Sequence, residues 1–187
     1  MSDISHSQYT DEENIFHRFL TIPWKAEYAR NKKNTKICPL CDPEDSLVVW
    51  KGKHTYLVLN KYPYNVGHAM VVTQQHIVSL EEIEMDVLAE IFFAIRLIIT
   101  ALKEVYGVDS YNIGLNIGPF SGASLQHLHI HIVPRYQNEL NFIDILSATR
   151  VIIENIENTA EKLRRKLHEL EDALKNSFKI ELNKHKS

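Results

Sequence analysis

Short apolar runs separated by turn-forming residues occupy the middle of the chain. Two of these runs flank Lys51-Gly52-Lys53, which predicts a β-hairpin, and a third follows a turn-rich stretch at residues 60–67. Two further runs lie closer to the C-terminus, with a glycine- and serine-containing loop between them. We therefore predict five strands, at residues 47–50, 56–59, 68–73, 111–117 and 127–133.

The segment between the third and fourth runs has the periodicity of a helix instead. Ser79 followed by Glu82 matches a capping box, and Gly107 is placed to end the helix as a left-handed cap. The apolar positions between them follow helical spacing: Leu88, Ile91, Phe92, Ile95, Ile98 and Ile99. The order of elements predicts an α+β domain, in which a long helix covers one face of a five-stranded antiparallel sheet.

Near the C-terminus, apolar residues alternate at spacings of three and four, which predicts a helix within residues 151–187 that carries an a/d seam. The seam positions are Ile153, Ile156, Ala160, Leu163, Leu167, Leu170 and Leu174. Such a seam packs either on its own domain or against a second subunit, and we expect a homodimer or a higher homo-oligomer. Residues 1–13 are polar and are expected to be disordered, and residues 14–150 to form the folded domain.

Composition narrows the class of protein. The chain has 187 residues, 44% of them apolar, and a net charge of -3, so it can bury a core and shows no basic excess for nucleic acid. No apolar run approaches the roughly 20 residues that span a bilayer, and the acidic N-terminus lacks the features of a secretory signal. Two cysteines only three residues apart form no disulfide framework. We expect a cytoplasmic protein that binds neither membrane nor nucleic acid.

His127, His129 and His131 alternate with apolar residues on the last predicted strand. Because strand side chains alternate between faces, the three imidazoles should share one face while the residues between them enter the core. Imidazoles in a row repel one another when protonated, so such a row rarely arises without a function. Three interpretations remain: an exposed face without function, a three-histidine metal site, or a site that handles phosphate.

The residues around this strand favour the phosphate site. Gly122 and Ser124 lie just upstream, in a loop of small residues whose backbone N–H groups can face an anion. Asn116 ends the preceding strand and adds a neutral donor, with Gly118 beside it. Arg135 adds positive charge near the end of the histidine strand. A metal site alone would need none of these groups.

The pattern His-φ-His-φ-His-φ-φ, where φ is apolar, resembles the signature of the histidine triad (HIT) superfamily of nucleotide hydrolases and transferases. Residues 59–68 resemble the nucleoside-binding strand and turn of that superfamily. Pro23-Trp24-Lys25 and Asn141-Phe142-Ile143 resemble the branch that includes bacterial diadenosine tetraphosphate phosphorylases and fragile-histidine-triad proteins.

The resemblance implies a role for each residue of the site. His129 attacks an α-phosphate and forms an AMP–histidine intermediate, His131 binds a phosphate oxygen and His127 supports the array. Asn60 corresponds to the residue that hydrogen-bonds ribose hydroxyls. The remaining substrate-binding positions are Asn116, Gly122, Ala123, Ser124 and Gln126.

Ala123 bears on the acceptor of the reaction. Dinucleoside hydrolases of the family typically carry Gln after the glycine that corresponds to Gly122, whereas the smaller Ala123 leaves room for a second anion. We therefore expect phosphorolysis of diadenosine tetraphosphate to ADP and ATP, with inorganic phosphate as acceptor. Gln126 departs from the acid that several phosphorylase relatives carry. The alternatives are hydrolysis of diadenosine polyphosphates or AMP-amines, and a non-catalytic nucleotide-binding protein.

Cys38 and Cys41 have the spacing of a zinc knuckle, in which two thiolates need two further ligands. The resemblance to zinc-containing branches of the superfamily supplies His76 and His127, so we expect a structural zinc ion and no organic cofactor. A redox dithiol and a pair of unliganded cysteines are the alternatives. His68, at the start of the third strand, receives no assignment.

Overall fold

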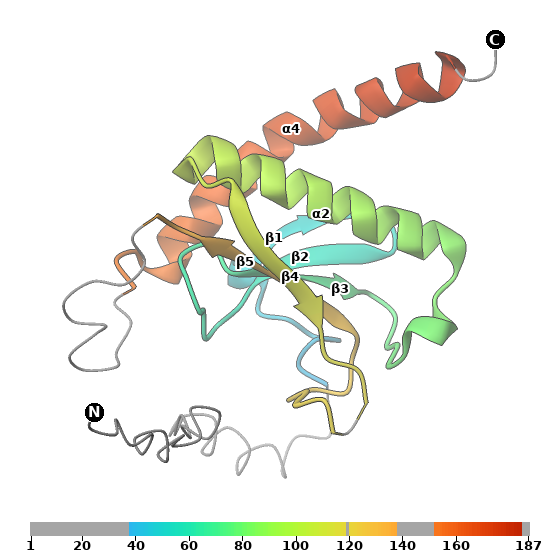
Figure 1. Cartoon of the computed structure of the whole chain (residues 1–187), viewed down its shortest axis with the longest axis vertical. Coiled ribbons are helices and arrows are strands. Elements are labelled where there is room, and N and C mark those ends of the chain that lie inside the picture. Colours follow the sequence, from blue (N-terminus) through green and yellow to red (C-terminus); the bar gives the residue numbers. More distant parts are fainter. Residues whose placement is uncertain (1–37, 119, 138–151, 185–187) are drawn as a thin grey trace, which may run out of the picture. The chain divides into compact units, whose positions relative to one another are not determined.

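The structure, a computed structural model, describes residues 38–118, 120–137 and 152–184, with side chains as far as residue 173. Its five strands form one antiparallel sheet in the spatial order β1-β2-β3-β5-β4 (Figure 1). The strands are β1 (Val48–Lys51), β2 (Thr55–Leu59), β3 (Ala69–Thr73), β4 (Ser110–Leu115) and β5 (His129–Arg135). The predicted α+β architecture is confirmed. The expectations for residues 1–13, 23–25 and 141–143 lie outside the described residues.

The long helix α2 (Met85–Tyr106) lies across one face of the sheet (Figure 1). It ends as predicted at Gly107, whose φ of 67° is left-handed and whose N–H donates back to the last turn at 2.9 Å. The predicted capping box is wrong, because a 3-10 turn, η4 (Leu80–Glu82), precedes α2 and the Ser79 hydroxyl contacts the Glu81 carboxylate. Among the described helices, none is both long and apolar enough to cross a membrane.

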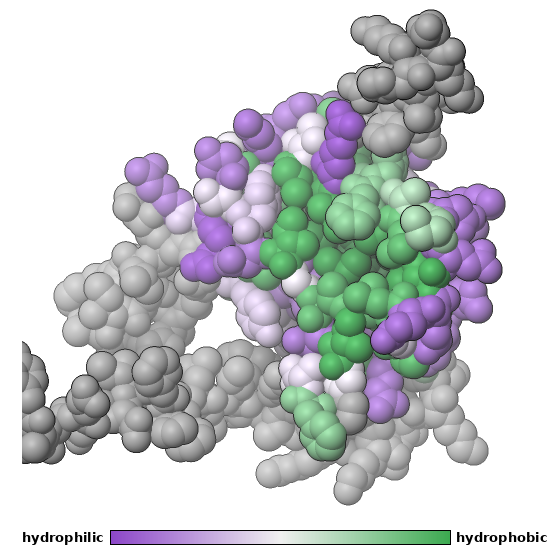
Figure 2. Space-filling view, turned by 45° about the vertical axis from the view of Figure 1, so that its right-hand side comes forward, coloured by the Kyte–Doolittle hydropathy of each residue, from purple (hydrophilic) through white to green (hydrophobic). Residues whose placement is uncertain are grey.

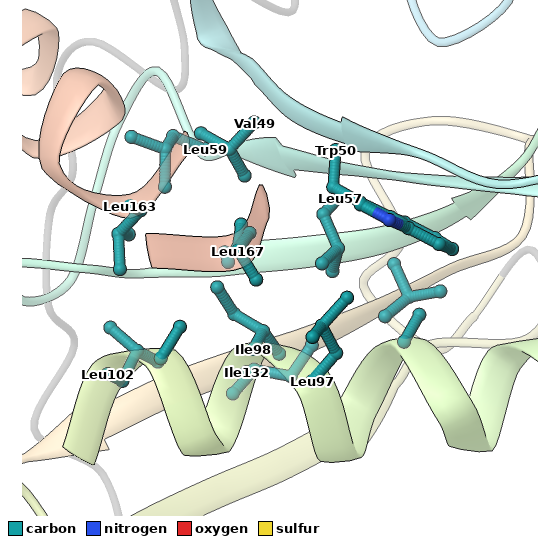
Figure 3. Close-up of a cluster of buried hydrophobic side chains, with 14 of the residues drawn as sticks. Val49, Trp50, Leu57, Leu59, Leu97, Ile98, Leu102, Ile132, Leu163 and Leu167 are labelled. Atoms are coloured by element: carbon teal, nitrogen blue, oxygen red, sulfur yellow. The ribbon is translucent and has the colours of Figure 1, made fainter. Parts of the chain in front are cut away.

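Each face of the sheet has its own apolar cluster. On the helix face, side chains of the sheet and of α2 point toward one another (Figure 3); they include Leu57, Leu97, Ile98, Leu102 and Ile132. On the other face, Met70 and Val72 of β3 belong to a second cluster. His131 and His129 pair with Met70 and Val72 across the sheet, and directly paired residues share a face. The sheet therefore presents these two histidines on the face opposite α2.

The C-terminal helix α4 (Ile156–Lys184) packs on its own domain. Three seam residues are almost completely buried in the core: Ala160, Leu163 and Leu167. Leu163 and Leu167 lie among side chains of the sheet and of α2 (Figure 3). Burial of each leucine contributes roughly 1.5–3 kcal/mol. The intramolecular alternative is therefore correct for these positions, and the coiled coil with a second subunit is wrong for them. Ile153 precedes the helix and is exposed, and the side chain of Leu174 lies outside the described residues.

Arg164 of α4 covers the sheet edge formed by β1. Its guanidinium donates to the carbonyl oxygens of Ser46 and Val48, each at 3.0 Å. Ser46 lies in η3 (Asp45–Leu47), the 3-10 turn that leads into β1. Unsatisfied carbonyls on an edge strand are a template for pairing with another chain. The helix therefore completes the core and also protects one edge of the sheet.

The strand boundaries differ from the prediction where the histidines begin. β5 starts at His129, two residues later than predicted, and continues through Pro134, while β4 ends two residues earlier than predicted. The N–H of Leu128 donates to the carbonyl of Ile77 at 2.6 Å, outside the ladder that joins β3 and β5. The prediction that all three histidines lie on one strand is therefore wrong for His127, which precedes β5.

Candidate functional site

His129 is the first residue of β5, and its side chain is buried. Its Nδ1 lies 2.7 Å from the backbone carbonyl oxygen of His127. Because a carbonyl oxygen only accepts hydrogen bonds, Nδ1 must carry the hydrogen. The lone pair of the neutral ring is then on Nε2, which is the arrangement of a nucleophile or a general base.

His131 and His68 form a hydrogen-bonded pair beside this ring. The backbone N–H of Tyr64 donates to Nδ1 of His68 at 3.1 Å, so the hydrogen of neutral His68 is on Nε2. That N–H donates to Nδ1 of His131 at 3.0 Å, which leaves the Nε2–H of His131 as a donor. The rings of His129 and His131 meet edge to face, with centroids 4.9 Å apart. The site thus combines a lone pair with a neighbouring N–H donor.

Burial keeps this pair neutral near neutral pH. Burial, reinforced by the nearby rings of His131 and His129, lowers the pKa of His68 to about 3. Burial and the ring of His129 also lower the pKa of His131 to about 4. The two rings therefore lie close together at neutral pH without the repulsion that two imidazolium ions would cause.

His68 is the site residue that the sequence pattern does not reveal. It lies two residues before Met70, and Met70 pairs with His131. Alternation along the chain then places His68 on the same face as His131. The sequence does contain this information, because His68 and Met70 are two residues apart and so share a face. It can be used only when the pairing of β3 with β5 is known.

His127 differs from the other two triad histidines. Its Nε2–H donates to the carbonyl of Thr73 at 2.9 Å, and its Nδ1 lies 3.5 Å from Sγ of Cys38 and 3.6 Å from Sγ of Cys41. Burial lowers the pKa of His127, which favours the neutral ring with its lone pair on Nδ1. The ring therefore faces the cysteines, while the carbonyl of the same residue accepts the hydrogen bond from His129.

Two thiols and two imidazoles form a cluster here: Cys38, Cys41, His76 and His127. Their four ligand atoms all lie within 4.8 Å of one another, and Nδ1 of His76 is 3.2 Å from Sγ of Cys41. A tetrahedral ion with typical bond lengths separates nitrogen and sulfur ligands by roughly 3.5 Å. The cluster therefore fits a metal ion in both donor type and spacing. The hydroxyl of Tyr56 donates to the carbonyl of Leu40 at 2.5 Å and so holds the segment between the two cysteines.

The loop between β4 and β5 carries most of the residues that were predicted to contact phosphate. Asn116 directly follows β4, and the register of the two strands continues to place it opposite His129. Gly118 and Gly122 have φ angles of 84° and 82°, which glycine adopts more readily than any other residue. The last part of the loop holds half-buried Ala123 and Ser124 and exposed Gln126.

Two groups do not lie as the phosphate interpretation expects. Arg135 is six residues beyond His129 on β5, roughly 20 Å away along the strand, and it donates to Oδ1 of Asn112 at 2.7 Å. Arg135 is near the end of the histidine strand as predicted, but the expectation that its charge serves a phosphate site beside His129 is wrong. The N–H of Ala123 donates to Oγ of Ser121 at 3.3 Å, so this backbone donor is used within the loop.

Asn60 lies in the turn after β2, next to the imidazole pair. Its Nδ2 is 3.4 Å from Nε2 of His68, and its Oδ1 accepts the N–H of Tyr62 at 3.0 Å. A cavity of about 340 Å³ opens beside this turn, and its lining includes Asn60, Gly67, His68, Ile156 and Thr159. The structure thus brings Asn60 close to the pair formed by His68 and His131.

A five-stranded antiparallel sheet with these histidines on one face and a long helix on the other has the architecture of the histidine triad class. The HIT domain family matches residues 43–138, and a protein from Mycobacterium tuberculosis named AP-4-A phosphorylase is 41% identical over 126 residues. The chain belongs to the HIT domain family. The alignment covers 67% of this chain and 64% of that relative, so it spans less than two thirds of the relative.

Other relatives agree with this assignment. A bis(5'-adenosyl)-triphosphatase from Saccharomyces cerevisiae is 35% identical over 91 residues, which are 48% of this chain and 44% of that protein. A solved structure from Sulfolobus tokodaii, described as a hypothetical histidine triad nucleotide-binding protein, has a TM-score of 0.58 at 27% identity, covering 71% of this chain and 93% of that one. A Zn-bound histidine triad family protein from Mycobacterium smegmatis shares the fold, with a TM-score of 0.60, 24% identity and coverage of 73% and 96%.

The imidazole pair predicts how stability depends on pH. The folded pKa values of about 3 and about 4 lie below the ordinary value of 6.5, so the folded state binds fewer protons than the unfolded state. The contribution of this pair to the free energy of unfolding should therefore be fully present above about pH 6.5. It should decrease steadily as the pH falls toward about 4. Replacing His68→Phe should reduce this loss by about half, as measured by urea denaturation across that range.

The control is His168→Phe, because His168 is exposed on α4. It should leave the pH dependence unchanged. Parallel pH curves for wild type and His68→Phe would show that this pair does not carry the effect.

Proposed function

We propose that the chain is an enzyme that transfers AMP from a diadenosine polyphosphate through a covalent AMP–His129 intermediate. The observation that carries the proposal is the 2.7 Å hydrogen bond from His129 to the carbonyl of His127, because it assigns the lone pair to Nε2. The names of the relatives that are 41% and 35% identical support diadenosine polyphosphates as the substrate class.

In the first step, Nε2 of His129 attacks the α-phosphorus and forms a nitrogen–phosphorus bond. The bond from this phosphorus to the bridging oxygen breaks, so diadenosine tetraphosphate releases ATP and leaves AMP on His129. The Nε2–H of His131 donates to a phosphate oxygen and stabilises the charge that develops there. His68 keeps that hydrogen in place by occupying Nδ1 of His131.

Other residues hold the substrate. Asn60 binds the ribose hydroxyls, and Asn116 contacts the phosphate from its position opposite His129. The loop before β5 completes the phosphate site with Gly122, Ala123, Ser124 and Gln126.

In the second step, inorganic phosphate attacks the same phosphorus, breaks the bond to His129 and forms ADP. The name of the relative that is 41% identical, AP-4-A phosphorylase, supports this acceptor, and so does the small side chain of Ala123. Hydrolysis is the second candidate, since the relative that is 35% identical is named a triphosphatase. Water would then release AMP instead of ADP.

Product analysis separates these reactions. With diadenosine tetraphosphate and phosphate, the wild type should form ADP and ATP, and without phosphate AMP should appear much more slowly. His129→Ala should lower turnover by about a thousandfold or more while it still binds substrate. Equal release of AMP with and without phosphate would reject phosphorolysis. Binding without products in the wild type would instead indicate a nucleotide-binding protein.

We further propose that the cluster of Cys38, Cys41, His76 and His127 holds a structural zinc ion. Two thiols and two imidazole nitrogens are a common donor set for structural zinc. A redox dithiol or a pair of unliganded cysteines would not require two imidazole nitrogens at 3.2–3.6 Å from the thiols.

The zinc proposal is tested by metal analysis. Freshly purified protein should contain about one zinc ion per chain, and His76→Ala should lose most of it because only three ligands remain. His54→Ala is the matched control, since His54 lies outside the cluster and contacts Asp86. A zinc content well below one per chain in the wild type would contradict the proposal.

We also propose that a second copy of the chain binds the surface formed by an apolar stripe of α2 and by the edge strand β4. We term this surface the α2–β4 face. Figure 2 shows a broad apolar area bordered by polar side chains. On α2, the apolar residues Leu88, Phe92, Ile95 and Ile99 form one stripe. The hydroxyl oxygen of Tyr111 on β4 lies 3.2 Å from the carbonyl oxygen of Ile99. In the described part of the chain, β4 has no strand on its outer side. Antiparallel pairing of two identical edges has the two-fold symmetry of a closed dimer.

Phe92, at 69% exposure, is the residue that tests this interface. Phe92→Glu should convert a dimer into a monomer, because a buried unpaired carboxylate opposes association. Val78→Glu is the control, since Val78 is 44% exposed but lies outside the α2–β4 face. Sedimentation equilibrium measures both. A monomeric wild type, or an unchanged dimer in Phe92→Glu, would contradict the proposal.

A further inference from the structure

His127 takes part in two sites at once. Its ring belongs to the Cys/His cluster, with Nδ1 at 3.5 Å from Cys38 and 3.6 Å from Cys41. Its carbonyl oxygen accepts the Nδ1–H of His129 at 2.7 Å. The same residue therefore connects the cluster to the group that determines which nitrogen of His129 has the lone pair.

The backbone that carries this carbonyl is not held by the sheet. The ladder between β3 and β5 begins where His129 pairs with Val72, so His127 lies outside it. The position of His127 depends on the 2.9 Å bond from its ring to the carbonyl of Thr73 and on the contacts of Nδ1 with the thiols. The carbonyl also shares a planar peptide group with the N–H of Leu128, so the partner of that N–H helps to fix its direction.

The next residue adds a second connection to the same cluster. The N–H of Leu128 donates to the carbonyl of Ile77 at 2.6 Å, and Ile77 directly follows His76. His76 is itself a member of the cluster, with Nδ1 at 3.2 Å from Cys41. Two neighbouring residues before β5 are thus tied to two members of the cluster, one through a side chain and one through the backbone.

We propose that metal binding by the cluster positions His129, because the metal holds the ring of His127 and thereby the carbonyl that accepts the Nδ1–H of His129. When the metal is removed, Nδ1 of His127 loses its partner and the loop before β5 is held by fewer contacts. His129 then populates both neutral tautomers instead of one. The cluster is therefore a positioning element for the nucleophile as well as a structural site. The inference rests on the proposed metal site, and its effect on turnover rests also on the proposed reaction.

The test measures the tautomer of His129 directly. Protein with ¹⁵N-labelled histidine is compared by long-range ¹H–¹⁵N correlation in three states: zinc-loaded, stripped with a chelator, and reloaded with zinc. We expect one tautomer, with hydrogen on Nδ1, in the loaded and reloaded states and a mixture in the stripped state. Cys41→Ser should reproduce the stripped spectrum at a temperature where circular dichroism shows the fold intact.

The matched control is Tyr56→Phe. It removes the hydrogen bond to the carbonyl of Leu40 and so weakens the same knuckle, but it leaves all four cluster residues in place. A purely stabilising role of the metal predicts that Tyr56→Phe and stripped wild type both lower the melting temperature and both keep one tautomer. The positioning role predicts a mixture in the stripped protein alone.

The outcome is decided by the tautomer and does not require turnover. A single Nδ1–H tautomer in the stripped protein overturns the inference, even when zinc removal lowers stability. If diadenosine tetraphosphate is a substrate, turnover should also fall about tenfold or more on stripping and return with zinc, as is typical for the loss of a supporting group. Failure of all turnover in the loaded protein would reject the proposed function while the tautomer measurement still tests the coupling.

Discussion

The hydrogen bond between Nδ1 of His129 and the carbonyl of His127 is the interaction on which the chemistry of the site depends. It converts a ring with two similar nitrogens into a ring with a defined donor and a defined acceptor. Two different parts of the fold supply its ends. The ladder with β3 places His129, whereas a loop beside the cysteines places the carbonyl. A strand alone would give the ring a direction but not a tautomer.

The closely spaced imidazoles of His68 and His131 are tolerated because their facing nitrogens form a donor–acceptor pair. The chain of donors runs from the backbone of Tyr64 through His68 to His131, and burial keeps both rings uncharged. The ring of His127 has different neighbours, because it faces the thiols. The triad motif therefore describes histidines at every second position, of which His127 faces the cysteines and His131 pairs with His68.

The sequence was sufficient for the sheet, for α2 and for the cap at Gly107, because these depend on local periodicity and backbone preference. Spacing selected Cys38 and Cys41, and the resemblance to the superfamily added His76 and His127; the fold brings these four residues together. The sequence was insufficient where the answer depends on contacts between distant segments. The bond from Leu128 to Ile77 moves the start of β5, and the pairing of β3 with β5 reveals His68. The a/d seam fits an internal or an external partner equally well, so only the buried position of Leu163 decides between them.

The contact of Arg164 with the outer carbonyls of β1 makes the two borders of the sheet unequal. One border is already occupied by a side chain of the same molecule, so a further strand would have to displace a guanidinium and its two hydrogen bonds. Within the described fold, a strand of another molecule can therefore add to the sheet only beside β4. Such polarity limits assembly to a finite number of copies and works against fibre-like growth, which needs two receptive borders on every unit.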